Sequence, residues 1–182
     1  MIDISEIYVL QNARDAVIHG VDVFGIIQPA GSSPTYGGYQ TGEDFSVYYG
    51  SSTSPIGVYV PQLNDRDDMS DPLLPYVEIT YDPHVASTTL LSREVLAGTI
   101  VWRVYVTDNR GYVVEGATTY KNDRAAMILR NRLFRMAETL PFNSVEVLEH
   151  GDAEPTQVYV HPDDDNIFIA EVSMYLEYID EI

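Results

Sequence analysis

Three segments of the sequence alternate apolar and polar side chains with a period of two residues. They cover residues 76–81, 99–107 and 168–178. Successive side chains of a β-strand point to opposite faces of the sheet, so each segment has one apolar and one polar face. This pattern is typical of antiparallel sheets that are covered on one side. The sequence therefore predicts a mainly antiparallel sheet with one face in the protein core.

Two segments with helical spacing predict the elements that cover this sheet. The first begins after Asp3, whose spacing to Glu6 fits a capping box. The second covers residues 123–140, with Asn122 as its candidate N-cap. The apolar stripe of the second helix is formed by Ala125, Leu129, Leu133, Met136 and Leu140. We therefore expect an α+β fold in which a long helix and an N-terminal helix cover one sheet face.

Residues 29–75 have a different composition from the rest of the chain. Gly and Pro recur throughout, mixed with Ser and Tyr, and only 45–49 and 56–60 fit short strands. An unstructured loop of this length is uncommon in a compact domain, so an extended insertion or arm and a surface loop both remain open. Further short strands fit 21–28, 145–148 and 158–160. The length predicts a single α+β domain over residues 1–182 that carries this insertion.

Acidic residues dominate the charge of the chain. Twenty-eight acidic and ten basic residues give a formal net charge of −18, which repels nucleic acid and anionic membranes. No apolar run approaches the roughly 18 residues of a membrane helix, and the first residues do not resemble a signal peptide. There are no cysteines, which excludes disulfides and thiolate metal sites. We expect no membrane contact and no specific binding of DNA.

Sequence patterns for catalysis and for metal binding are weak. The acidic run that begins at Asp65 has Met69 and Ser70 where a calcium loop needs a ligand and a glycine. No two of the four histidines have a zinc-ligand spacing, although His150 and His161 lie in neighbouring strand segments and could approach each other. There is no nucleophile elbow, phosphate loop or dinucleotide fingerprint. We expect a binding protein rather than an enzyme, with no cofactor and no metal.

Half of the basic residues lie within the second helix or beside it. They are Lys121, Arg124, Arg130, Arg132 and Arg135. At 100° per residue, all of them except Arg130 span an arc of about 80° with Ile128 at its centre. Such a stripe complements the acidic surface of a second copy, although surface charges are often solvated or paired internally. The candidate subunit interface therefore comprises Lys121, Arg124, Ile128, Arg132 and Arg135.

The order of these elements resembles the tail terminator proteins of long-tailed bacteriophages. The resemblance rests on the strand segments 74–81, 99–106 and 170–178, on the helix at 123–140, and on the N-terminal helix. It covers that helix and roughly residues 74–180, whereas the insertion at 29–75 departs from the compact pattern of the family.

This resemblance implies a virion structural protein that is assembled in the cytoplasm of the bacterial host. The chain would form a homo-hexameric ring in the tail or neck. The ring would cap the tail tube, stop its polymerisation and join it to the head-completion proteins. DNA would pass through the ring without specific binding, which suits an acidic lumen. The resemblance implies no catalytic residues.

Two other functions remain open at the level of sequence. An acidic chain can act as a DNA mimic that inhibits a nucleic-acid enzyme, but here the acids are scattered over loops and strand faces. A hydrolase would need a catalytic cluster that is visible only in a structure.

Overall fold

The computed structural model describes residues 4–19, 28–29, 57–63, 76–84, 89–90, 93–107, 112–115 and 118–179. The helices are α1 (Ile4–His19) and α3 (Asn122–Glu138), with a 3₁₀ turn at Pro61–Leu63. The strands, in chain order, are β1 (Gln28–Pro29), β2 (Gly57–Tyr59), β3 (Tyr76–His84), β4 (Thr89–Leu90), β5 (Arg93–Thr107), β6 (Tyr112–Glu115), β7 (Thr118–Tyr120), β8 (Glu146–Pro155), β9 (Tyr159–His161) and β10 (Asp164–Ile179).

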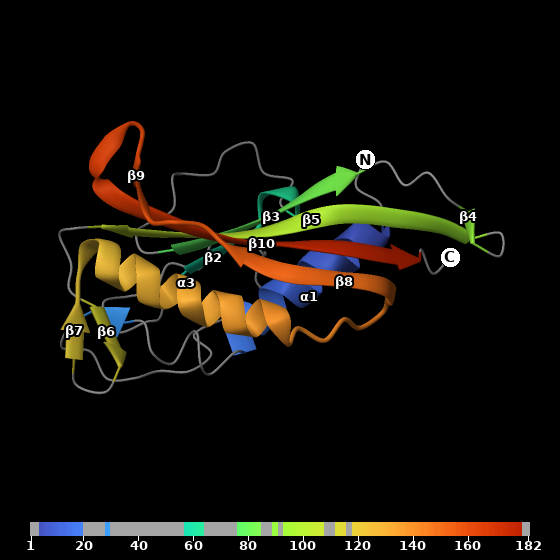
Figure 1. The fold of residues 1–182 in the computed structure, drawn as a ribbon, viewed down its shortest axis with the longest axis horizontal. Coiled ribbons are helices and arrows are strands. Elements are labelled where there is room, and N and C mark those ends of the chain that lie inside the picture. The colour runs from blue at the N-terminus through green and yellow to red at the C-terminus, as the bar shows by residue number, and fades with distance from the viewer. Residues whose placement is uncertain are drawn as a thin grey trace.

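The main sheet has the strand order β2-β3-β5-β10-β8 (Figure 1). All neighbours are antiparallel except β2 and β3, which are parallel. β9 pairs with the first half of β10 and β8 with the second half, so the two strands together form one edge of the sheet. β1, β6 and β7 form a separate small sheet beside the start of α3. The predicted α+β fold with a mainly antiparallel sheet is confirmed.

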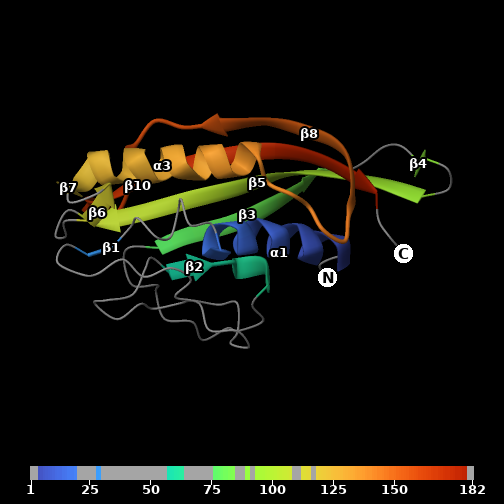
Figure 2. The same ribbon diagram turned by 90° about the horizontal axis from the view of Figure 1, so that it is seen from below.

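Both helices pack on the same face of the main sheet (Figure 2). α1 contacts β3 and α3, and α3 contacts β5, β8 and β10. The sheet contributes alternate side chains to the core, such as Val172, Met174 and Leu176 of β10. The indole Nε1 of the fully buried Trp102 donates a hydrogen bond to the backbone oxygen of Ala13 over 3.2 Å. The sheet and α1 are thus joined by a polar contact inside an apolar core.

A glycine and a tyrosine fit together inside this layer. The ring of Tyr81 on β3 lies over Gly98 on β5, and a Cβ at Gly98 would be 2.2 Å from the tyrosine Cζ. The Tyr81 hydroxyl lies 3.1 Å from the hydroxyl of Tyr178 on β10. Burial raises the pKa of Tyr81 to about 12, with smaller contributions from the charges of nearby carboxylates. Because Gly98 has no side chain, the ring of Tyr81 fits above it and the Tyr81 hydroxyl reaches the hydroxyl of Tyr178.

Several elements are longer than their sequence patterns predict. β5 starts at Arg93 rather than at 99, β8 continues to Pro155 rather than ending at 148, and β10 starts at Asp164. Asn122 is not the N-cap of α3. That position belongs to Lys121, whose backbone oxygen accepts the bond from the N–H of Ala125.

Some predictions fall on other parts of the chain. The segment expected at 21–28 except for Gln28, the segment expected at 45–49, and most of the insertion at 29–75 lie outside the described residues. Among the residues that are described, neither helix is long and apolar enough to cross a membrane.

Candidate subunit-interaction surface

Three of the five candidate interface residues are exposed at or near the surface of α3. They are Lys121, Arg124 and Arg135. Arg124 and Arg135 lie on the side of α3 opposite its buried residues, and Lys121 lies one position before the helix. None of the three forms an ion pair within the described part of the chain. Glu138 is exposed on the same side of α3, so the outer side of the helix presents an excess of positive charge, with three cations against one carboxylate.

The other two candidates lie closer to the core. Ile128 is half-buried and packs against the core cluster, so its main contacts are within its own subunit. Arg132 is half-buried and has interactions of its own. The structure thus divides the predicted arc into an exposed part and a part that borders the core.

Met127 is an interface candidate that the sequence analysis missed. Its side chain is 42% exposed, and it follows Arg124 by three positions on the same side of α3. The spacing alone could have suggested it, because residues three apart on a helix are neighbours. We define the α3 face as Lys121, Arg124, Met127 and Arg135.

Arg130 has a different role from the other cations of α3. Its guanidinium donates to the backbone oxygen of Thr156, which lies between β8 and β9, and to Oδ1 of Asn131. Arg130 therefore holds α3 against the edge of its own sheet.

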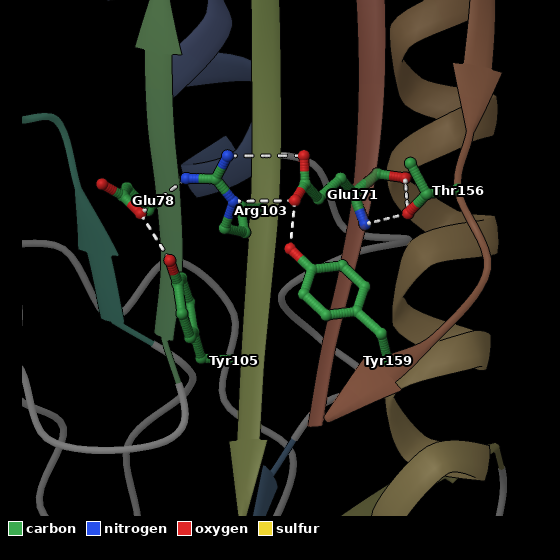
Figure 3. Close-up of polar contacts among 6 residues, drawn as sticks. All are labelled: Glu78, Arg103, Tyr105, Thr156, Tyr159 and Glu171. Atoms are coloured by element: carbon green, nitrogen blue, oxygen red, sulfur yellow. Dashed lines mark hydrogen bonds and ion pairs between the residues drawn. The ribbon is translucent and has the colours of Figure 1, made fainter. Parts of the chain in front are cut away.

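The opposite face of the main sheet, directed away from α1 and α3, carries a network of charged side chains. We refer to this face of the main sheet as the outer face. Glu78 on β3, Arg103 on β5 and Glu171 on β10 are neighbours in the strand register (Figure 3). Arg103 donates from Nε to Glu171 over 3.0 Å and from Nη1 to Glu78 over 3.3 Å. One guanidinium thus links three strands through two carboxylates.

Tyrosines extend this network on both sides. The hydroxyl of Tyr105 donates to Glu78 over 2.8 Å, and that of Tyr159 donates to Glu171. Tyr76 stacks on Tyr105 with ring centroids 4.4 Å apart. Because these donors and the guanidinium surround the two carboxylates, the carboxylates of Glu78 and Glu171 already have partners within the subunit.

The pKa values of this network follow from its geometry. Burial raises the pKa of the Glu171 carboxyl, but the hydrogen bonds from Arg103 and Tyr159 outweigh it and leave the pKa below its ordinary value. Burial and the hydrogen bond to Glu171 raise the pKa of Tyr159 to about 12. The bonding around Glu171 therefore favours an ionised glutamate beside a neutral Tyr159 phenol at neutral pH.

In the described ranges, no three His, Cys, Asp or Glu side chains gather as a metal site. His150 lies opposite Leu176 and His161 opposite Asp164, twelve positions apart along β10. At about 3.3 Å per residue this is about 40 Å, so the two histidines do not share a site.

No protein-family model matches the sequence, and a search of curated proteins found no significant match.

Proposed function

We propose that this protein is a structural subunit of a bacteriophage virion, similar to a tail terminator or neck subunit. Copies of the chain form a ring, with six subunits expected, that caps the tail tube and connects it to the head-completion proteins. The α3 face contributes to the contact between neighbouring subunits, and DNA passes through the ring without specific binding.

The observation that carries this proposal is the exposed positive charge of the α3 face on a chain with a net charge of −18. Two copies with this net charge repel each other at long range. Association therefore requires a local region of opposite sign, and the α3 face supplies it. The fold adds support. Both helices pack on one face of the sheet, and the helices and strands occur in the order on which the family resemblance rests.

The test is to measure assembly of the purified chain, alone and with the tail-tube protein of the same virion. Size-exclusion chromatography with light scattering gives the mass, and negative-stain electron microscopy gives the shape. We expect ring-shaped particles with a mass that is a multiple of 20.4 kDa, bound at the ends of tail tubes.

A matched pair of variants tests the part played by the α3 face. Arg124→Gln and Gln11→Glu each make the net charge more negative by one, but Gln11 lies on α1 rather than on α3 or on the sheet edge formed by β8 and β9. We expect Arg124→Gln to weaken ring formation and Gln11→Glu to leave it unchanged. A protein that stays monomeric and ignores the tube protein contradicts the proposal. A monomer that competes with DNA for a nucleic-acid enzyme would support a DNA mimic instead.

A further inference from the structure

Exposed large apolar side chains of the described residues lie on only two surfaces. Met127 lies on the α3 face, and the other three lie on the sheet edge formed by β8 and β9. Those three are Leu148, Tyr159 and Val160, with exposed fractions of 42%, 39% and 44%. Exposed apolar side chains that gather on one surface are typical of regions where partners bind, whereas a single one carries weight only together with other features of the surface. Both surfaces therefore have the composition of an interface.

The edge strand also carries unneutralised negative charge. Glu149, Asp152 and Glu154 on β8 are exposed, and none has an ion pair within the described residues. Two β8 edges cannot pair with each other without bringing these like charges together. A cationic partner therefore fits this edge better than a second copy of the edge.

The carboxylates of the outer face are poorer acceptors than those of the edge. Glu78 and Glu171 are bound by Arg103 and by tyrosine hydroxyls, and Glu177 accepts a hydrogen bond from Tyr175. A new arginine would have to displace these partners, which cancels most of the gain. An arginine that binds the carboxylates of the β8–β9 edge would have no such partners to displace.

We propose that the α3 face of one subunit docks on the β8–β9 edge of a second copy. The signs of the charges support this pairing, and the side chains are long enough to bridge the difference in their spacing. Arg124 and Arg135 are separated by about 17 Å along the helix, at about 1.5 Å per residue. Glu149 and Glu154 lie opposite Glu177 and Ser173 of β10, so they are separated by about 13 Å along the strand, at about 3.3 Å per residue. Met127 on one side and Leu148 on the other add an apolar contact beside the charges.

The two surfaces are different parts of the same molecule, so the contact is heterologous. α3 already lies against β8 of its own subunit, and Arg130 donates to the backbone oxygen of Thr156 just after that strand, so the α3 face is directed elsewhere. Each subunit therefore offers one donor surface and one acceptor surface, which generates a closed ring or an open filament. This inference deepens the proposed ring, and it defines which surfaces meet.

Charge-swapped variants test the pairing. The first variant carries Arg124→Glu and Arg135→Glu, and the second carries Glu149→Lys and Glu154→Lys. We expect each alone to raise the dissociation constant of the oligomer at least about tenfold, since both charge pairs become repulsive. An equimolar mixture restores both kinds of contact, because each variant complements the other. The mixture should therefore form oligomers as the wild-type protein does, measured by light scattering and electron microscopy.

A control variant separates the effect of the charges on the β8–β9 edge from the effect of the net charge of the chain. Asp82→Lys with Glu94→Lys makes the same change in net charge at exposed positions of β3 and β5, and should leave assembly unchanged. Circular dichroism confirms that each variant is folded.

The experiment distinguishes a failure of the α3–edge pairing from a failure of the proposed function. If the wild-type protein forms rings but the mixture stays dissociated, the α3–edge pairing is wrong and the proposed function stands. If the wild-type protein remains monomeric at every concentration and with the tail-tube protein, both are wrong.

Discussion

Arg103 and Glu171 lie directly opposite each other on β5 and β10, and the guanidinium binds both carboxylate oxygens, over 3.0 and 3.4 Å. Their side chains are 28% and 19% exposed, so water only partly screens the pair. Glu78 closes the network from β3 on the other side. A charged cluster thus connects three strands on the face of the sheet directed away from α1 and α3.

The first prediction concerns Arg103→Ala. The change leaves two half-buried carboxylates facing each other without the guanidinium, so we expect a loss of about 1–3 kcal/mol in the free energy of unfolding. Urea unfolding followed by circular dichroism measures it. Arg93→Ala is the control, because Arg93 pairs with Glu146 at an exposed position and such pairs contribute about 0–1 kcal/mol. Equal losses in the two variants would show that burial of the network has no energetic consequence.

The second prediction concerns Gly98→Ala. The new Cβ would overlap the ring of Tyr81, which cannot move away without breaking its contact with Tyr178. We expect a loss of about 1–3 kcal/mol in the free energy of unfolding. In a Tyr81→Ala background the same substitution should cost much less, because the ring is absent. Additive effects of the two changes would rule out the close approach as the cause.

The third prediction concerns alkaline pH. The pKa of Tyr81 is raised from 10.0 to about 12, chiefly by burial. A raised pKa means that the folded protein resists losing this proton, so the contribution of Tyr81 to stability is full below pH 10 and is lost as the pH rises toward 12. The urea midpoint of the wild-type protein should therefore fall more steeply between about pH 10 and about pH 12 than that of Tyr81→Phe. Parallel profiles would contradict this assignment.

The fourth prediction concerns Trp102→Phe. The smaller ring leaves a void beneath α1 and removes the donor for the backbone oxygen of Ala13, so we expect a loss of about 1–3 kcal/mol in the free energy of unfolding. Circular dichroism in urea gives the value without relying on indole fluorescence. Met127→Ala, at an exposed position, should stay within about 0.5 kcal/mol of the wild type. A loss as large for Met127→Ala would indicate that α3 packs through its outer side.

The sequence predicted those strands that have one polar and one apolar face. β10 from residue 168 onward follows this rule, because every second residue enters the core. The start of β5 does not, since Val95 and Ala97 are buried on one face while Leu96 and Gly98 lie on the other. With apolar or small residues on both faces, the period of two disappears. The sequence therefore predicted only the second half of that strand.

The edge strand and the charged network were harder to predict for a different reason. β8 pairs with β10 through two irregularities in register, which shift its side chains out of simple alternation. The network of Glu78, Arg103 and Glu171 depends on strand register, which a single sequence does not specify. By contrast, the positive charge on α3 was predictable, because helical spacing alone fixes which side chains are neighbours. The difference in burial between the two neighbours Arg124, which is exposed, and Ile128, which is half-buried, comes from the structure alone.

The central position of β10 has a consequence for the order of folding. β5 ends at Thr107 and β10 begins at Asp164, yet the two pair along almost their whole length. On a ribosome, β3 and β5 emerge well before the strand that covers their free edge is made. An incomplete chain would thus expose an apolar strand edge that binds chaperones or aggregates. A chain truncated before Asp164 would therefore leave one side of β5 without the strand that pairs with it.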